Sequence, residues 1–246
     1  MQITAVVPTS NEAGNLPGLI ESLAALPLED LRVLVVDDAS PDGTGQIADE
    51  LARQDPGRVS VLHRERKMGL GTAYLAGFQH VLETGAEAIA QMDADLSHPP
   101  ELLLEFVEAL RSCDLVVGSR YVPGGSVDRS WPLWRKGLSA FGSLYAHTIL
   151  RLPVRDLTSG FKLWRRSTLL GIPLQRVSSN GYAFQIEMTY LAHRMGYRIR
   201  ELPFYFPDRE WGRSKISFAI QIEAALRVWQ LLFEYRDLEA RSEHQP

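Results

Sequence analysis

Two aspartates, Asp93 and Asp95, follow directly after an apolar run and are separated by a single residue. The run covers residues 86–92, and a buried strand that ends in Asp-x-Asp places two oxygen ligands at the carboxyl edge of a sheet. Open α/β folds bind their ligands at that edge. Carboxylates there suit Mg²⁺ or Mn²⁺, which commonly hold substrate phosphates. A polar strand end followed by a helix N-cap gives the same pattern, so the motif alone leaves both interpretations open.

Two earlier strand patterns also end in polar or acidic residues. Residues 3–8 form a β-branched run that stops shortly before Glu12, and residues 31–36 form a nearly apolar run that ends in Asp37 and Asp38. A continuous apolar run is expected for a strand that is buried on both faces of a parallel sheet. The carboxyl ends of such strands meet at one edge. Three acidic ends in succession therefore favour a nucleotide and metal site over the N-cap interpretation.

Helical patterns alternate with these strands. Apolar residues recur at helical spacing after each early strand and again after Pro99 and Pro100. This alternation predicts right-handed βαβ units, and so an α/β fold with a mostly parallel central sheet flanked by helices. Gly69 and Gly71 open one of the helices but lack the complete G-x-G-x-x-G fingerprint, which argues against a Rossmann dehydrogenase. Further strands are expected over residues 59–62, 115–118 and 199–206.

The net charge of −4 hides an asymmetry between the two halves of the chain. Residues 1–119 carry 7 Lys and Arg against 19 Asp and Glu, whereas residues 120–215 carry 16 against 6. An acidic half with Asp-x-Asp beside a basic half predicts a metal–phosphate substrate with a second anionic ligand next to it. The basic residues are dispersed among apolar ones, so we expect no nucleic-acid partner. The single Cys113 is expected to be a buried thiol, and the N-terminus lacks a signal-peptide pattern, which predicts a cytoplasmic protein.

Two segments in the second half are amphipathic. Residues 131–152 carry a helical apolar stripe that starts with two tryptophans and three cations, and residues 216–235 carry four polar residues along one stripe. Neither has about 20 uninterrupted apolar residues, so neither is expected to span a membrane. Each segment could instead lie in a membrane interface or pack on the sheet. The Trp131–Lys136 stretch favours the interface, since two tryptophans beside three cations suit a headgroup region better than a core.

Two further features carry charge. The loop 208–215 places Arg209, Arg213 and Lys215 close together around a glycine and a serine, which is typical of a phosphate clamp but also of a solvated loop. Glu187 lies on a predicted helix after Asn180, and we interpret it as an acid at the edge of the core rather than as an acceptor ligand.

Several motifs occur together in a fixed order over residues 3–215. They are Val-Pro-Thr-Ser-Asn-Glu at 7–12, Val-Asp-Asp-Ala-Ser-Pro-Asp-Gly-Thr at 36–44, Gly-Leu-Gly-Thr-Ala at 69–73, Met-Asp-Ala-Asp-Leu-Ser-His-Pro-Pro at 92–100, Gly-Ser-Arg-Tyr at 118–121, Asp156 with Thr-Ser-Gly-Phe at 158–161, and Phe206 with Asp208, Arg209, Gly212, Ser214 and Lys215. This set resembles the family-2 glycosyltransferases of the GT-A fold, and within them the dolichyl- and polyprenyl-phosphate mannosyltransferases. Ser10 departs from the tyrosine that relatives often carry, and we expect a form without the transmembrane helices that follow the domain in some relatives.

The resemblance implies a single GT-A domain over residues 1–246, with a nucleotide-sugar and metal half (1–119), an acceptor half (120–215) and an amphipathic helix and tail (216–246). It also implies roles for individual residues. Asp93, Asp95 and Ser97 form the metal site, while Asp95, Arg120 and Arg209 are the catalytic residues. The acceptor phosphate is held by Arg120, Arg135 and Ser139. The donor-binding residues are Pro8, Ser10, Glu12, Val36, Asp38, Asp93, Ala94, Asp95, Arg209 and Lys215.

The function that the resemblance implies is inverting transfer of mannose from GDP-mannose to a polyprenyl or dolichyl monophosphate, with Mg²⁺ or Mn²⁺ as cofactor. The enzyme would be peripheral on the cytoplasmic face of the membrane, attached by its surface helices or by an integral-membrane partner. Other interpretations remain open. A UDP-sugar-dependent glucosyl- or N-acetylhexosaminyltransferase would carry the same motifs, and a nucleotidyltransferase shares the acidic α/β plan. A non-catalytic membrane scaffold would explain the amphipathic segments but not the three acidic strand ends.

Overall fold

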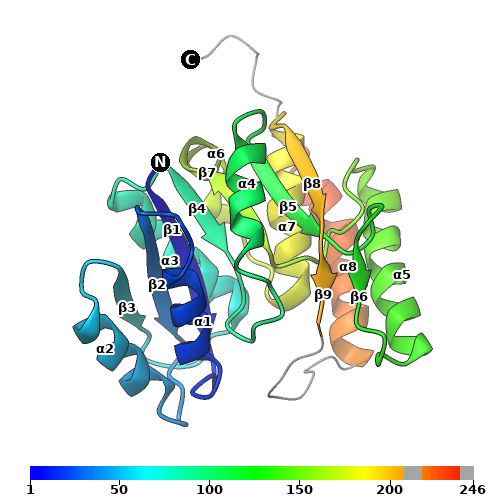
Figure 1. Ribbon diagram of the computed structural model, residues 1–246. Helices are drawn as coiled ribbons and strands as arrows, with labels where there is room; N and C mark the ends of the chain where they lie inside the picture. The colour runs from blue at the N-terminus through cyan, green and yellow to red at the C-terminus, as the bar shows by residue number, and fades with distance from the viewer. Residues whose placement is uncertain (208–217, 239–246) are drawn as a thin grey trace.

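A seven-stranded sheet crosses the centre of the computed structural model, which describes residues 1–207 and 218–238 (Figure 1). The strand order is β3-β2-β1-β4-β7-β5-β8, and β7 runs antiparallel to both of its neighbours. The other pairings are parallel, which confirms the predicted mostly parallel α/β fold. The strands are β1 (Ile3–Thr9), β2 (Leu31–Asp37), β3 (Val59–His63), β4 (Ala88–Gln91), β5 (Leu115–Ser119), β7 (Lys162–Arg165) and β8 (Ile199–Pro203).

The strand predicted over residues 199–206 is wrong as a single element. It divides at Phe204, whose side chain is buried, so that β8 pairs with β5 while β9 (Tyr205–Phe206) pairs with β6 (Ser126–Val127) in a separate two-stranded sheet. The second sheet thus joins the segment that follows β5 to the segment that follows β8. The chain therefore changes its pairing partner after Pro203.

Helices cover both faces of the central sheet and bury two separate cores. Strand residues alternate between them, so that Val6 and Val36 face one core while Val7 and Val35 face the other, as the period of two in a strand requires. One face is covered by α1 (Leu16–Ala24), α2 (Thr44–Gln54) and α4 (Leu102–Leu110). The opposite face is covered by α3 (Leu70–Glu83), α5 (Leu133–Leu150), α6 (Arg166–Gly171), α7 (Gly181–Arg194) and α8 (Phe218–Glu234).

The helices α5 and α8 pack against each other at one end of the molecule (Figure 1). The Tyr145 hydroxyl donates to the carbonyl of Ala225, and the Trp229 indole donates to the Tyr145 hydroxyl. The pair nevertheless leaves large apolar side chains in solvent, with exposures of 70% at Trp134 and 67% at Phe233. Large exposed apolar side chains that gather on one surface mark interaction sites in many proteins. No helix in the described part of the chain is both long and apolar enough to cross a bilayer.

The side chains at the start of α5 divide between core and surface. Trp131 is buried and packs edge-on against Phe206, with the Arg135 guanidinium 3.7 Å from its ring centroid. The expectation that both tryptophans of this stretch lie at an interface is therefore wrong for Trp131, because the β9 aromatic ring covers it. Trp134 and Leu133 are exposed and fit the expectation.

Candidate active site

The carboxyl end of β4 carries Asp93, whose carboxylate is held by an aromatic hydroxyl from the helix beneath it. The Tyr74 hydroxyl on α3 donates to Asp93 Oδ1 at 2.9 Å. Burial, together with the charge of Asp93, raises the pKa of Tyr74 well above its usual value, so the phenol stays protonated and remains a donor. The Asp93 backbone N–H donates to Nδ1 of His98 at 2.9 Å, which assigns the imidazole proton to Nε2. His98 stacks on Phe161 and fixes the turn after the strand.

Asp95 and Ser97 lie together inside that turn. Both are buried, and the Ser97 hydroxyl and backbone N–H donate to Asp95 Oδ1 at 2.5 and 3.2 Å. Leu96 between them has φ 60°, a left-handed conformation that costs free energy in a residue other than glycine. Such strain is typical of functional turns, where the surrounding contacts impose it.

The residues at this turn fit a hard divalent cation that is completed by a substrate. Asp93 and Asp95 offer carboxylate oxygens, the donors that Mg²⁺ and Mn²⁺ prefer. In the described residues no group of three or more His, Cys, Asp or Glu side chains is placed to hold an ion. A cation here would therefore take its other ligands from water and a diphosphate. Gly160 leaves the space open, because a Cβ at this position would lie 3.4 Å from both Asp93 carboxylate oxygens.

Asp38 is buried at the end of β2, where its carboxylate orders the loop before α3. The Arg64 guanidinium donates to Asp38 Oδ1 at 2.8 Å, and the backbone N–H groups of Met68 and Gly69 donate to the same carboxylate. The Asn180 side chain accepts from the Gly71 N–H and donates to the Met68 carbonyl. The Asp38 carboxylate therefore already holds the loop before α3 in place. A nucleotide base that bound to Asp38 would have to share this carboxylate with the loop. Its role in donor binding remains a prediction.

The other predicted donor residues lie along the same sheet edge. Pro8 and Val36 are opposite each other in the β1–β2 register and are buried. Glu12 follows β1, and its carboxylate accepts from the Asn15 amide at 2.7 Å. Ser10 is half-buried beside it and Ala94 is buried between the two aspartates. The structure thus gathers Pro8, Ser10, Glu12, Val36, Asp38, Asp93, Ala94 and Asp95 at one edge, while Arg209 and Lys215 lie outside the described residues.

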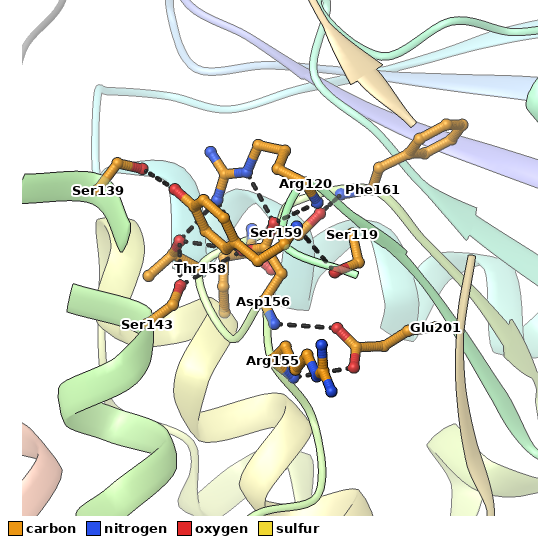
Figure 2. A network of polar contacts seen from close by, with 12 residues as sticks. Ser119, Arg120, Ser139, Ser143, Arg155, Asp156, Thr158, Ser159, Phe161 and Glu201 are labelled. Atoms are coloured by element: carbon orange, nitrogen blue, oxygen red, sulfur yellow. Dashed lines mark hydrogen bonds and ion pairs between the residues drawn. The ribbon is translucent and has the colours of Figure 1, made fainter. Parts of the chain in front are cut away.

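Across the sheet, Arg120 at the end of β5 forms a buried ion pair with Asp156 (Figure 2). Its Nε and Nη2 atoms each donate to one carboxylate oxygen at 2.7 Å, and Nη2 also donates to the Thr158 hydroxyl. Burial acts to raise the pKa of Asp156, but the Arg120 charge and hydrogen bonds outweigh it and lower that pKa. The Asp156 N–H donates to the Glu201 carboxylate on β8, so the Arg120–Asp156 ion pair links the end of β5 to β8.

The predicted acceptor residues lie on two neighbouring elements. Ser139 on α5 accepts a hydrogen bond at 2.6 Å from the hydroxyl of Tyr121, the residue that follows Arg120 (Figure 2). Arg135 lies one turn before Ser139 and covers the Trp131 ring. The structure therefore places Ser139 against the Arg120 segment, while Arg135 lies on the same helix. Their contact with an acceptor phosphate remains a prediction.

Glu187 on α7 is fully buried, deeper than the core-edge position expected for it. Its carboxylate accepts hydrogen bonds from the Ser179 N–H at 2.8 Å, the Arg227 guanidinium at 3.1 Å and the Tyr235 hydroxyl at 2.5 Å. Arg227 and Tyr235 come from α8 and the segment that follows it. The polar stripe of α8 therefore includes a residue that faces α7. On the same helix Val228 and Leu231 are buried in the core, whereas Leu226 and Phe233 are exposed.

Lys162 on β7 is a buried amine within reach of the charges of Asp156 and Asp93. Its ammonium donates to the Ser159 carbonyl and to both oxygens of Gln185, at 2.7–3.3 Å. Burial lowers the pKa of Lys162 to about 7, against the charges of Asp156 and Asp93. An unfolded lysine titrates near pH ~10.4, so between about pH 7 and 10 the unfolded chain binds more protons at this residue. This group therefore makes the free energy of unfolding rise with pH.

We accordingly expect Lys162→Met to lose this pH dependence. The difference in unfolding free energy between the wild type and Lys162→Met should change in favour of the wild type by up to about 1.4 kcal/mol per pH unit over that interval. Urea denaturation at several pH values measures it. Lys67→Met, at an exposed position, is the matched control and should follow the wild type. Parallel curves for Lys162→Met and the wild type would contradict the assignment.

Four residues of the site were not predicted from the sequence. Tyr74 belongs to an apolar helical stripe, and nothing in its spacing indicates that its hydroxyl reaches Asp93. His98 lies within the quoted motif of residues 92–100, and Arg64 is a polar residue shortly before the motif of residues 69–73, which was a usable signal. Asp156 was noted in a motif without a role, because its partner Arg120 is 36 residues away in the sequence.

Comparison with known proteins agrees with this geometry. Residues 4–170 match the model of glycosyl transferase family 2. The chain is 48% identical to an undecaprenyl-phosphate mannosyltransferase of Micrococcus luteus, over 98% of this chain and 99% of that protein. It is 46% identical to a polyprenol monophosphomannose synthase of Mycolicibacterium smegmatis, over 91% of this chain and 84% of that protein.

Solved structures share the fold at lower identity. A glucosyl-3-phosphoglycerate synthase from Mycobacterium tuberculosis, solved with Mn²⁺, UDP-glucose and phosphoglyceric acid, matches with a TM-score of 0.67 at 18% identity, over 98% of this chain and 81% of that one. A mannosyltransferase from Pyrobaculum calidifontis, solved with GDP-mannose and Mn²⁺, matches with a TM-score of 0.63 at 19% identity, over 98% and 66%. The family match and the relatives that span nearly the whole chain show that this protein belongs to glycosyl transferase family 2.

Proposed function

We propose that this protein transfers mannose from GDP-mannose to a polyprenyl monophosphate, with inversion at the sugar's C1. The observation that carries the proposal is the position of the Asp93–Asp95 turn, at the sheet edge that the buried Arg120–Asp156 pair also borders. The two bacterial relatives are named for transfer of mannose to polyprenyl phosphates and span nearly the whole chain, which supports this donor and this acceptor class.

On the donor side, Asp93 and Asp95 would hold the divalent metal. When bound, such a metal acts as a Lewis acid that stabilises the negative charge of the departing diphosphate. Tyr74 and His98 keep Asp93 in place through its side chain and its backbone, so the carboxylate needs little rearrangement when substrate binds. The Mn²⁺ complexes of the structural neighbours support a divalent ion, and we propose that Mg²⁺ or Mn²⁺ serves here.

On the acceptor side, the nucleophile would be a phosphate oxygen of the prenyl phosphate. A monophosphate has its second pKa near ~6, so this oxygen is ionised at neutral pH and needs no general base. Arg120, Arg135 and Ser139 would bind the phosphate and offset its repulsion from the diphosphate. Asp156 holds the Arg120 guanidinium in a bidentate geometry, which fixes the direction of the cation before the acceptor arrives.

A panel of nucleotide sugars tests this function. The protein is incubated with prenyl phosphate, Mg²⁺ or Mn²⁺, and labelled GDP-mannose, UDP-glucose or UDP-N-acetylglucosamine, and labelled lipid is extracted. We expect label in the lipid fraction from GDP-mannose only. Labelled lipid from a UDP-sugar alone would mean that the donor is that UDP-sugar and that the reaction type is unchanged. The absence of labelled lipid with every donor would contradict the function.

We also propose that the exposed side chains of α5 and α8 attach the enzyme to the cytoplasmic face of the membrane, where the prenyl acceptor lies. An integral-membrane partner could add to this attachment. Leu133, Trp134 and Phe141 of α5 are exposed, as are Leu226 and Phe233 of α8. Amphipathic helices bind the interface by burying such side chains among lipid acyl chains.

Replacing Phe141 and Phe233 by serine should release the protein from vesicles. Burying an aromatic side chain is worth about 1.5–3 kcal/mol, so losing two should lower the membrane partition coefficient at least about tenfold. Co-flotation with phosphatidylcholine vesicles measures this coefficient. The matched control is Leu104→Ser with Leu170→Ser, which removes exposed leucines from α4 and α6 and should leave flotation unchanged. Equal loss in both double variants would contradict attachment through this face.

A further inference from the structure

A cavity of about 700 Å³ opens between the C-terminal ends of α5, α7 and α8. Ile149, Trp229 and Leu232 form an apolar wall, while Arg151 and Arg194 bring two cations to the opening. The described residues that line it include no aspartate or glutamate. A cavity with an apolar wall and a purely cationic charge fits an anionic amphiphile better than a neutral or cationic ligand. We call it the C-terminal pocket.

The C-terminal pocket continues the exposed apolar surface of the two helices. On α5, Leu144 is exposed about two turns before the helix ends, and the C-cap residue Arg151 lines the pocket. On α8, Leu226 and Phe233 are also seven residues apart and exposed, and the exposed Arg236 comes three residues later. Cations thus occur where each apolar stripe ends. Acyl chains lying along the stripes would bring their head group to these arginines.

Arg194 connects α7 to this end of the molecule. Its guanidinium donates to the backbone carbonyl of Arg236 at 3.2 Å, which holds it beside the end of α8. A second explanation for these cations is the helix macrodipole, because arginine near a helix C-terminus is stabilising by itself. That explanation requires neither the cavity nor its apolar wall, and it predicts an effect on stability alone.

The C-terminal pocket is separate from the proposed acceptor site. Arg135 and Ser139 are near the start of α5, whereas Arg151 is at its end. At 1.5 Å per residue, the 16 residues from Arg135 to Arg151 span about 24 Å. One phosphate group cannot contact both ends of the helix. A lipid at the pocket would therefore be a second ligand rather than the substrate.

We propose that the C-terminal pocket binds the phosphate head group of an anionic phospholipid, whose acyl chains lie on the exposed faces of α5 and α8. The proposal rests on the membrane attachment proposed above and adds a preferred lipid class to it. Arginine suits this role because its planar guanidinium binds phosphate oxygens in pairs. Attraction to an anionic membrane surface raises the partition coefficient about fivefold for each basic residue. The two arginines together should therefore raise it about 25-fold.

Co-flotation with two vesicle types tests the proposal, one of phosphatidylcholine alone and one that also contains phosphatidylglycerol. We expect the wild type to bind the second type more tightly, and Arg151→Ala with Arg194→Ala to lose about 25-fold of that preference. Binding to pure phosphatidylcholine should stay unchanged in this variant. The matched control, Arg53→Ala with Arg111→Ala, removes the same charge from α2 and from the end of α4 and should keep the preference. Arg151→Glu, at an exposed position, should abolish the preference by itself.

Three results would overturn the proposal. Equal loss in the control variant would show diffuse electrostatic attraction without a pocket. If Arg151→Ala with Arg194→Ala lowered the melting temperature but kept the lipid preference, the two arginines would only stabilise the helix ends through the macrodipole. A wild type that floats with neither vesicle type would remove both the pocket and the membrane attachment. Sugar transfer to detergent-dispersed prenyl phosphate is measured in parallel, so failure of the proposed chemistry is distinguished from all three.

Discussion

Replacing Asp95 by asparagine is expected to lower the rate of sugar transfer by about three orders of magnitude while leaving the protein folded. The metal's stabilisation of the departing diphosphate is worth several kcal/mol, and about 4 kcal/mol corresponds to a factor of about 10³ in rate. An amide keeps the shape of the side chain and one acceptor oxygen for Ser97, whose N–H and hydroxyl hold Asp95 in the turn. It removes the charge on which a hard cation depends.

The measurement is initial-rate transfer from GDP-mannose over a range of Mn²⁺ concentrations, together with the melting temperature. We expect the asparagine variant to need far more Mn²⁺ or to show no metal response at all. Asp114→Asn is the matched control, because Asp114 precedes β5 at the opposite edge of the sheet and accepts hydrogen bonds from Arg198. It should retain the wild-type rate. An Asp95 variant with the wild-type rate at the wild-type metal requirement would show that the turn is not the metal site.

The strands that build this edge were predictable because each leaves a local pattern. β1, β2 and β4 are short apolar runs that end in or near acids, and parallel strands bring such ends together whatever their order in the sheet. The placement of Asp93 and Asp95 on the same sheet edge as Asp38 follows from this rule. The helices were predictable for the same reason, because apolar residues recur at helical spacing along the sequence.

The insertion of β7 between β4 and β5 was not predictable in this way. It depends on polar contacts between distant residues, because the Trp164 indole donates to Gln91 and the Gln91 amide donates to Gln185. Nothing in the periodicity of β7 indicates an antiparallel strand with a buried lysine, Lys162. Periodicity describes which face of an element is apolar. It does not describe which distant polar group completes a buried hydrogen bond.

The same limit applies to the surface of α8. Its polar residues Arg227 and Glu234 would be expected to face water, but Arg227 pairs with both Glu234 and the buried Glu187 on α7. The helix also buries Val228 and Leu231 in the core, while it exposes Leu226 and Phe233. An amphipathic pattern shows that a helix has two different faces. It does not show which face packs inward when a buried acid on the neighbouring helix pairs with one of the polar residues. In the structure α8 packs into the core through one side and exposes apolar side chains on another, so it is a core helix whose contact with a membrane interface remains a prediction.

The second large effect concerns stability. Asp156→Ala is expected to lower the free energy of unfolding by about 3–5 kcal/mol, because it leaves the Arg120 guanidinium buried without its counter-charge. The backbone N–H, Nε and Nη2 of Arg120 all donate to this carboxylate, so several buried donors lose their acceptor together. Urea denaturation near neutral pH measures the change. Asp30→Ala, at an exposed position outside this network, is the control and should lower the free energy of unfolding by less than about 1 kcal/mol.

The acid limb of the stability curve gives an independent check on the same pair. The pKa of Asp156 is lowered in the folded protein, so the unfolded chain protonates first as the pH falls. The stability that the pair contributes is therefore present above the unfolded pKa near ~3.9 and is lost as the pH drops through the lower folded value. The difference between wild type and Asp156→Ala should stay constant from neutral pH down to about pH 5 and shrink below pH ~4. A difference that shrinks between pH 7 and 5 would mean that another group titrates in its place.

Removing both partners separates the structural role of Arg120 from its proposed contact with the acceptor. Arg120→Met with Asp156→Leu replaces the pair by apolar side chains, and such exchanges are often neutral or stabilising once no charge remains buried alone. We expect the double variant to regain most of the stability that Asp156→Ala loses. If Arg120 also binds the acceptor phosphate, the KM for prenyl phosphate should stay raised in this stable variant, at an unchanged KM for GDP-mannose. Recovery of both stability and acceptor KM would assign Arg120 to the framework alone, and acceptor binding would then fall to Arg135 and Ser139.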